Sequence, residues 1–249
     1  MTAAVEAVAA ADATGRNRRA NLVAFVVMVA LIAIAPFVAY PFFIMQALCF
    51  ALFACAFNLL IGYVNLLSLG HAMFLGLASY VCAHAAKVWG FEPVTAILLG
   101  VIASTVLGLV IGALAIRSSG IYFAMITVAF SQMVFFVCLE APFTHGEDGI
   151  QAVPQGRALG LFDLSNPWIL YVFVAVIFLF GFLAIMRIVN SPFGEILKAI
   201  RENEPRVISL GYRATLYKLA AFTLSAAFAG LAGATNCLLY TSPSPRDTR

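Results

Sequence analysis

Residues 44–64 read IMQALCFALFACAFNLLIGYV and contain no Asp, Glu, Lys or Arg. The uncharged segment extends in both directions from this stretch, from Asn21 to Ala86. A helix needs about 20 apolar residues to cross the roughly 30 Å hydrocarbon core of a bilayer. This segment is therefore long enough for three crossings, and it predicts a membrane-embedded protein.

The composition of the whole chain agrees with this interpretation. Of its 249 residues, 63% are apolar and 10% are charged, whereas soluble domains have about 45–50% and about 25%. These values exclude a soluble globular enzyme, a disordered chain and a collagen-like fibre. The net charge of +3 is mild and does not indicate nucleic-acid binding. The five cysteines include no CxxC pair, so we interpret them as packing residues rather than as disulfides or a zinc site.

Charged residues, glycine and proline divide the apolar sequence into seven predicted spans. The fold class is therefore an all-α polytopic transmembrane helical bundle. Residues 1–20 are expected to form a cytoplasmic N-terminal tail. The expected spans cover residues 22–40, 44–64, 66–86, 94–116, 121–139, 168–186 and about 219–240.

Loop charges predict the orientation of these spans. Arg16, Arg18 and Arg19 place the N-terminus in the cytoplasm, because cytoplasmic loops carry an excess of Lys and Arg. Alternation then places residues 140–166, which are rich in acids, outside. It returns residues 187–218, which are rich in Lys and Arg, to the inside.

The sequence contains none of the motifs that carry common enzyme chemistry. It has no GxxxxGK[ST] phosphate-binding loop, no GxSxG elbow and no HExxH helix. His145, Glu147 and Asp148 share a loop and are interpreted as solvated rather than as metal ligands. We therefore predict no catalytic residue, no metal and no cofactor. The spans also hold almost no ionisable group, which disfavours a secondary transporter or a channel.

Residues 62–71, GYVNLLSLGH, place two glycines and several polar side chains at membrane depth. Two interpretations remain open. A broken helix offers backbone N–H groups that suit a carboxylate substrate. The alternative is a plain short loop between the second and third spans.

Residues 190–217 form the largest polar segment between spans. Ser191 is expected to cap a helix that begins at Pro192. Pro205 is expected to start a second short helix that ends at Gly211. The predicted two-helix hairpin is amphipathic, and it serves either as an interfacial linker or as a docking element for a cytoplasmic partner. The apolar stripe comprises Ile196, Leu197 and Ile200, opposite Lys198, Arg201 and Glu202.

Small residues recur at helical spacing, as in Gly108 and Gly112 or Ser225, Ala229 and Gly233. Such faces allow helices to approach closely in a membrane, so packing is the expected role.

Several motifs together resemble one family, the inner-membrane permeases for branched-chain amino acids of the LivM type. The resemblance covers roughly residues 25–235. Its motifs are Gly62-Tyr63, Ser68-Leu69-Gly70-His71-Ala72-Met73-Phe74, Ser119 through Phe130, Gly146 through Ile150, Ser191-Pro192-Phe193-Gly194, Ala199 through Glu204, Ser209-Leu210-Gly211 and Tyr217-Lys218-Leu219.

The resemblance implies one membrane subunit of an ATP-binding-cassette importer. The implied partners are a second permease, two ATPase subunits that bind the ATP, a periplasmic binding protein and the lipid bilayer. Residues 190–217 would then be the cytoplasmic loop that contacts the ATPase. The residues expected to carry this coupling are Ser191, Pro192, Phe193, Gly194, Ala199, Ile200, Arg201, Glu202, Glu204 and Gly211.

For the substrate path, we expect Ser68, Gly70, His71 and Thr127 to contribute. Closely similar permeases serve urea and short amides, so these substrates remain an alternative. The sequence departs from the family at Asn65, where many members have glycine. Residues 21–236 are expected to be the permease region, and residues 237–249 resemble translated adaptor sequence, so the chain is expected to be a truncated copy.

Overall fold

The computed structural model of the protein describes residues 25–36, 40–118, 120–141, 157–158, 162–163 and 166–239. Two compact units comprise residues 1–44 and 45–249, and the contacts described below lie within the second. Helices dominate, which confirms the predicted all-α class. The helices are Phe25–Pro36, α2 (Pro41–Val64), α3 (Ala72–Lys87), α4 (Pro93–Ala115), α5 (Ile121–Glu140), α6 (Pro167–Val189), α7 (Pro192–Ser209) and α8 (Ala214–Leu239). Strands β1 (Arg157–Ala158) and β2 (Phe162–Asp163) pair antiparallel.

Seven of these helices occupy the positions of the predicted spans. Five of them, namely α2, α4, α5, α6 and α8, are long and apolar enough to cross a membrane. The third predicted span was expected to begin at Leu66, but α3 begins at Ala72 and has only 16 residues. The difference arises because the backbone is not helical between Asn65 and His71.

Local sequence explains where several helices begin. Pro93 and Pro167 occupy the first turn of α4 and α6, where the missing N–H of proline has no helical partner to lose. The Asn166 side chain accepts a hydrogen bond from the Trp168 N–H at 3.1 Å and so caps α6. Gly120, at φ 61°, turns the chain into α5.

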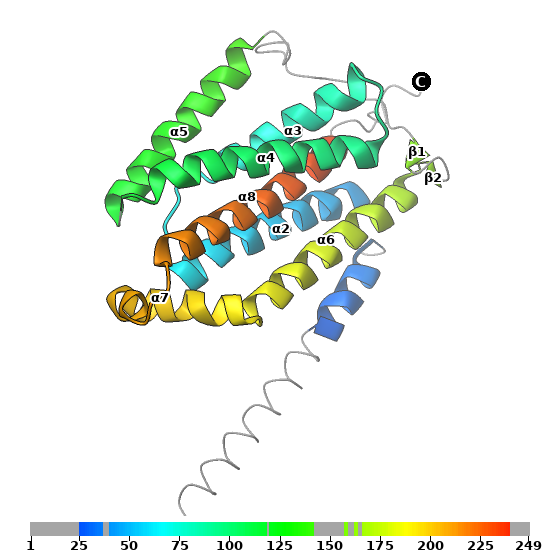
Figure 1. Ribbon diagram of the computed structural model, residues 1–249. Helices are drawn as coiled ribbons and strands as arrows, with labels where there is room; N and C mark the ends of the chain where they lie inside the picture. Colours follow the sequence, from blue (N-terminus) through cyan, green and yellow to red (C-terminus); the bar gives the residue numbers. More distant parts are fainter. Residues whose placement is uncertain are drawn as a thin grey trace, which may run out of the picture. The chain divides into compact units, whose positions relative to one another are not determined.

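Helix α8 forms the centre of the second unit, packed against α3 and α4 (Figure 1). In its most apolar window 72% of the residues are buried, against 22% in α5. Small residues bring the helices together: a Cβ added to Gly108 of α4 would lie 2.4 Å from the Ala226 Cβ of α8. Across the same contact the Ser104 hydroxyl donates to the Ala226 carbonyl at 2.8 Å. The predicted small-residue faces therefore serve helix packing.

Large apolar side chains cover the outside of the bundle. They recur at helical spacing on α4, at Leu98, Ile102 and Val106, and on α6, at Val172, Val176 and Phe180. Each of these side chains is exposed. Small residues at the contacts between helices, with large apolar side chains on the outside, suit a bundle surrounded by lipid.

The helices alternate in direction, as the predicted spans require. Gly112 of α4 lies beside Phe222 of α8, while Gly100 lies beside Ala234, so these two helices run antiparallel. Helix α7 lies at the end of the bundle where α6 finishes and α8 begins (Figure 1). Contacts described below show that α2 also ends there.

The packing at Gly108 gives a direct test. Gly108→Ala should lower the free energy of unfolding by about 1–3 kcal/mol, because the new methyl overlaps Ala226. Gly76→Ala is the matched control, since a Cβ there meets nothing within 4 Å. Unfolding in detergent followed by circular dichroism measures both variants. Equal stability of the two variants would contradict the described packing of α4 on α8.

Candidate functional site

The non-helical connection between α2 and α3 is covered by protein on one side. Leu66, Ser68 and Gly70 are buried, whereas Leu67 and Leu69 between them are exposed. Alternation of this kind is typical of extended backbone, whose successive side chains point in opposite directions. We call residues 65–70 the unwound segment. It joins two antiparallel helices, as the predicted plain loop does. The predicted break began at Gly62, but Gly62 lies within α2, which continues to Val64.

Asn65 makes the turn that ends α2. Its φ of 60° lies in the left-handed region, which asparagine tolerates better than most residues other than glycine. The next residue, Leu66, donates its N–H to the Leu60 carbonyl at 3.3 Å and closes the helix end. Asparagine is therefore a chemically suitable replacement for the glycine expected at this position.

At its other end the unwound segment packs against α5. A Cβ added to Gly70 would lie 2.0 Å from the Thr127 carbonyl oxygen and 2.9 Å from the Ser131 Cβ. The Thr127 hydroxyl is buried and donates to the Ala124 carbonyl at 2.8 Å. Only glycine allows this approach, so Gly70 and Thr127, both predicted path residues, are in direct contact.

His71 links three helices through one short chain of hydrogen bonds. The Ser225 hydroxyl of α8 donates to the Ala56 carbonyl of α2 at 2.5 Å. Because the hydroxyl has a single proton, His71 Nε2, 3.0 Å away, must carry the proton that it donates to Ser225 Oγ. This bond fixes the neutral imidazole as the Nε2–H tautomer and leaves Nδ1 as an acceptor.

Aromatic rings surround His71 on several sides. The imidazole lies 5.1 Å from the Phe74 ring and 6.2 Å from the Phe222 ring, both edge-to-face, and within 6 Å of Phe53 and Phe57. Within the part of the chain that the structure describes, His71 Nδ1 and Ser68 Oγ are buried without a hydrogen-bond partner. All four predicted path residues are thus buried near one another at the start of α3.

An open groove lies beside this cluster, between α3 and α5. Its volume is about 150 Å³ and its walls are mostly apolar. It includes Ser131, the residue that faces Gly70. Its lining comprises Ala72, Met73, Gly76, Leu77, Tyr80, Ser131, Val134, Phe135 and Cys138.

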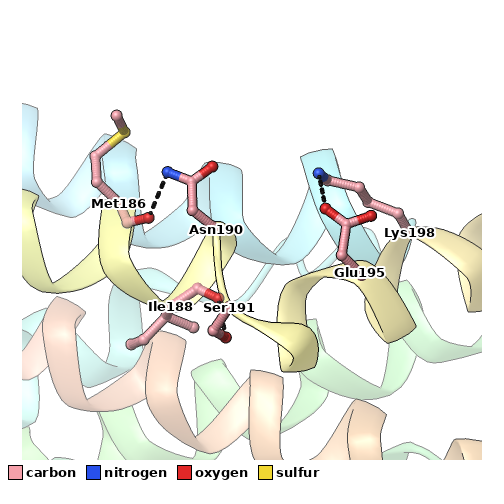
Figure 2. Close-up of polar contacts among 6 residues, drawn as sticks. All are labelled: Met186, Ile188, Asn190, Ser191, Glu195 and Lys198. Carbon is pink, nitrogen blue, oxygen red and sulfur yellow. Dashed lines mark hydrogen bonds and ion pairs between the residues drawn. The ribbon is translucent and has the colours of Figure 1, made fainter. Parts of the chain in front are cut away.

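Figure 2 shows the sharp turn from α6 into α7. The Asn190 side-chain amide donates to the Met186 carbonyl at 2.9 Å, and the Ser191 hydroxyl donates to the Ile188 carbonyl at 2.6 Å. Ser191 occupies the expected cap position, but its side chain does not cap α7. That part of the prediction was wrong, because the hydroxyl turns back to the Ile188 carbonyl of α6, which also accepts the Ser191 backbone N–H at 3.2 Å. Gly194 also has no room for a Cβ, which would lie 2.1 Å from the Val189 carbonyl oxygen.

The predicted two-helix hairpin is present in α7. Its backbone leaves the helical region at Asn203, whose side chain accepts a hydrogen bond from the Arg206 N–H at 3.1 Å and caps the second helix. Gly211, at φ 91°, ends that helix. There Tyr212 donates its N–H to Val207 and Gly211 donates to Ile208, the pair of bonds that defines a Schellman motif.

The apolar stripe of α7 is buried against α8. Leu197 is fully buried, and Ile200 clusters with Val207 and with Ala214 of α8. An ion pair of 2.6 Å between Glu204 and Lys218 adds to this contact. The hairpin and the first turns of α8 therefore pack as one unit.

The polar face of α7 makes a different contact. Arg201 Nη1 donates a hydrogen bond to the Gly62 carbonyl oxygen in the last turn of α2. Lys198 instead pairs with Glu195 within α7, at 2.8 Å, and this hydrogen bond raises the pKa of the Lys198 ammonium (Figure 2). Between α2 and α7 an open cleft of about 540 Å³ is lined by Asn58, Gly62, Tyr63, Lys198, Arg201 and Glu202.

Sequence reasoning identified Arg201 and His71 but not their partners. Ser225 appeared only as a small packing residue, and Gly62 appeared as part of the break. A backbone carbonyl such as that of Gly62 leaves no signal in a sequence, and neither does the pairing of two side chains as distant along the chain as His71 and Ser225, so neither contact was predictable. Within the described residues no three His, Cys, Asp or Glu side chains gather as metal ligands. His145, Glu147 and Asp148 lie outside those residues.

The covered unwound segment, the lipid-facing apolar surfaces and the amphipathic hairpin define a multi-pass helical membrane protein. A family model described as "Branched-chain amino acid transport system / permease component" matches residues 39–249. The chain belongs to this family of transport permeases.

Curated relatives carry matching names. The high-affinity branched-chain amino acid transport system permease protein LivM of Salmonella typhimurium is 29% identical, over 83% of this chain and 55% of its own length. LivM of Escherichia coli is 27% identical with the same coverage. A probable LivM of Methanocaldococcus jannaschii is 28% identical over 55% of this chain and 41% of its own length. The chain thus spans about half the length of the curated relatives it matches. No solved structure matches it significantly.

The left-handed turn at Asn65 gives a second prediction. Asn65→Val should destabilise the protein by about 1–2 kcal/mol, because a β-branched side chain is strained at this φ. Asn65→Gly, which removes the side chain at the same position, should leave stability unchanged or raise it. Thermal unfolding in detergent compares the two variants. Equal loss of stability in both would show that the side chain of Asn65, and not its backbone angle, is what matters.

Proposed function

We propose that this chain is an inner-membrane permease subunit of an ATP-binding-cassette importer for branched-chain amino acids. The observation that carries the proposal is the permease-family match over residues 39–249, together with the amphipathic hairpin at α7. The partners would be a second permease, two ATPase subunits and a periplasmic binding protein. ATP would be bound by the ATPase subunits, and this chain would hold no cofactor and catalyse no reaction.

The hairpin would contact the ATPase subunits on the cytoplasmic side. Its apolar stripe is already used against α8, so its exposed polar surface is what remains for a partner. That surface includes Glu195, Ala199, Glu202 and Arg206. A docking element with one face anchored in its own bundle suits the transmission of movement into the spans.

The substrate would pass beside the cluster formed by Ser68, Gly70, His71 and Thr127. The groove between α3 and α5 supports this path, since its walls are mostly apolar and suit an aliphatic side chain. The buried acceptor His71 Nδ1 and the Ser68 hydroxyl offer polar groups to the charged end of an amino acid. Alternating access would then expose this region to each side of the membrane in turn.

Coupling is tested by disrupting the hairpin in a complete transporter that contains the full-length permease. Arg201→Glu or Ile200→Pro should lower uptake per ATP hydrolysed by about tenfold, since each removes contacts that join α7 to α2 or α8. Lys87→Glu, at the opposite end of α3, is the matched charge reversal and should have little effect. Substrate uptake and phosphate release in proteoliposomes are measured together. Unchanged coupling in both hairpin variants would reject this role.

Orientation gives a separate prediction. The loop of residues 140–166 should face the periplasm, because acids predominate in it. Helix α7 should face the cytoplasm, because Lys and Arg predominate in residues 187–218, which contain it. A cysteine placed at Gln155 should react with an impermeant maleimide in intact spheroplasts. A cysteine at the exposed Ala199 of α7 should react only after lysis. The reverse pattern would invert the proposed topology.

A further inference from the structure

Helices α7 and α8 contact the residues that flank the unwound segment, Gly62 before it and His71 after it. We propose that Arg201 and Ser225 are positioning residues that fix residues 65–70 to the unit formed by α7 and α8. A displacement of the hairpin then repositions the segment as a whole. The proposal rests on the proposed function, because it names the route by which the hairpin reaches the predicted substrate path.

At the first end, Arg201 satisfies a carbonyl that α2 leaves without a partner. Gly62 lies within the last four residues of α2, whose carbonyls have no acceptor role inside the helix. A guanidinium also interacts favourably with the negative end of the helix dipole. Arg201 itself is exposed and retains further N–H groups, so its bond to Gly62 is a tie between elements rather than part of a buried core.

At the second end, Ser225 makes its hydrogen bonds in a fully buried position. It joins α8 to the Ala56 carbonyl and to His71, the residue that follows the segment. The edge-to-face contacts of His71 with Phe74 and Phe222 keep the imidazole oriented toward Ser225. A shift of α8 along its axis therefore carries His71 with it.

The two ties belong to one body, because α7 and α8 are themselves joined. The cluster of Ile200, Val207 and Ala214 and the ion pair between Glu204 and Lys218 connect the hairpin to α8. Between the ties, the segment also meets a third helix, because Gly70 lies against the Thr127 backbone of α5. A movement of the hairpin would therefore shift both ends of the segment, while the contact of Gly70 with α5 would hold the segment in place.

The experiment measures local opening of the segment in the full chain in lipid nanodiscs. The five native cysteines are replaced by alanine, and Ser68→Cys, a nearly isosteric change at a position 1% exposed, serves as the reporter. N-ethylmaleimide then reacts with this thiol only when the segment opens. A parallel reporter, Ala78→Cys in α3, is fully buried and detects global loosening.

We expect Arg201→Ala and Ser225→Ala each to raise the labelling rate at position 68 by about tenfold, with no change at position 78. Arg201→Lys should restore most of the slow rate, because an ammonium can also donate to the Gly62 carbonyl. Lys198→Ala is the control for Arg201, since its ion pair stays within α7. Ser104→Ala is the control for Ser225, since its equally buried hydroxyl bonds to an α8 carbonyl away from the segment.

Three outcomes overturn the proposal: an unchanged rate at position 68 in both variants, an equal rise in the controls, or a parallel rise at position 78. The labelling result is independent of transport. If a complete transporter with the unaltered permease shows no ATP-driven uptake while labelling responds as expected, the proposed function fails and the positioning role stands. If uptake is ATP-driven and labelling does not respond, only the positioning role fails.

Discussion

Hydrocarbon offers no hydrogen-bond partner, so every backbone N–H and carbonyl inside a membrane must be satisfied by the protein itself. Helices meet this requirement internally, and the described spans are helical throughout. The unwound segment, residues 65–70, is not helical, so its backbone groups depend on contacts with the rest of the bundle. Asn65 makes a left-handed turn at its start, Gly70 touches α5 at its end, and His71, which follows it, is hydrogen-bonded to α8. A bulkier side chain at Gly70 or a β-branched one at Asn65 would not fit this backbone.

Helix α8 is the element that makes such an arrangement possible. Its small residues allow α3 and α4 to approach closely, and its buried hydroxyl at Ser225 reaches both α2 and the start of α3. Its first turns also carry the contact with α7. One helix therefore connects the polar hairpin to the unwound segment, with no flexible linker between them. This continuity explains why motifs separated by more than a hundred residues in the sequence lie in one region of the bundle.

Much of this organisation follows from the sequence, because its causes are local. Uncharged runs predict the spans, and Pro192 and Gly211 mark the limits of the hairpin. The remainder depends on tertiary contacts that a sequence does not encode locally. The start of α3 at Ala72 instead of Leu66 is one case. The hydroxyl of Ser191 is another, since it turns back to the Ile188 carbonyl of α6 instead of capping α7.

In the proposed transporter, α7 would be the surface on which an ATPase subunit acts. Photo-crosslinking from Ala199, exposed on α7, tests it directly when the full-length permease is co-expressed with the ATPase subunits of its own transporter. We expect an adduct at this position that mass spectrometry identifies as the ATPase, and none from the exposed Val172 of α6. Adducts from Ala199 to lipid alone, in membranes where the ATPase is present, would contradict it.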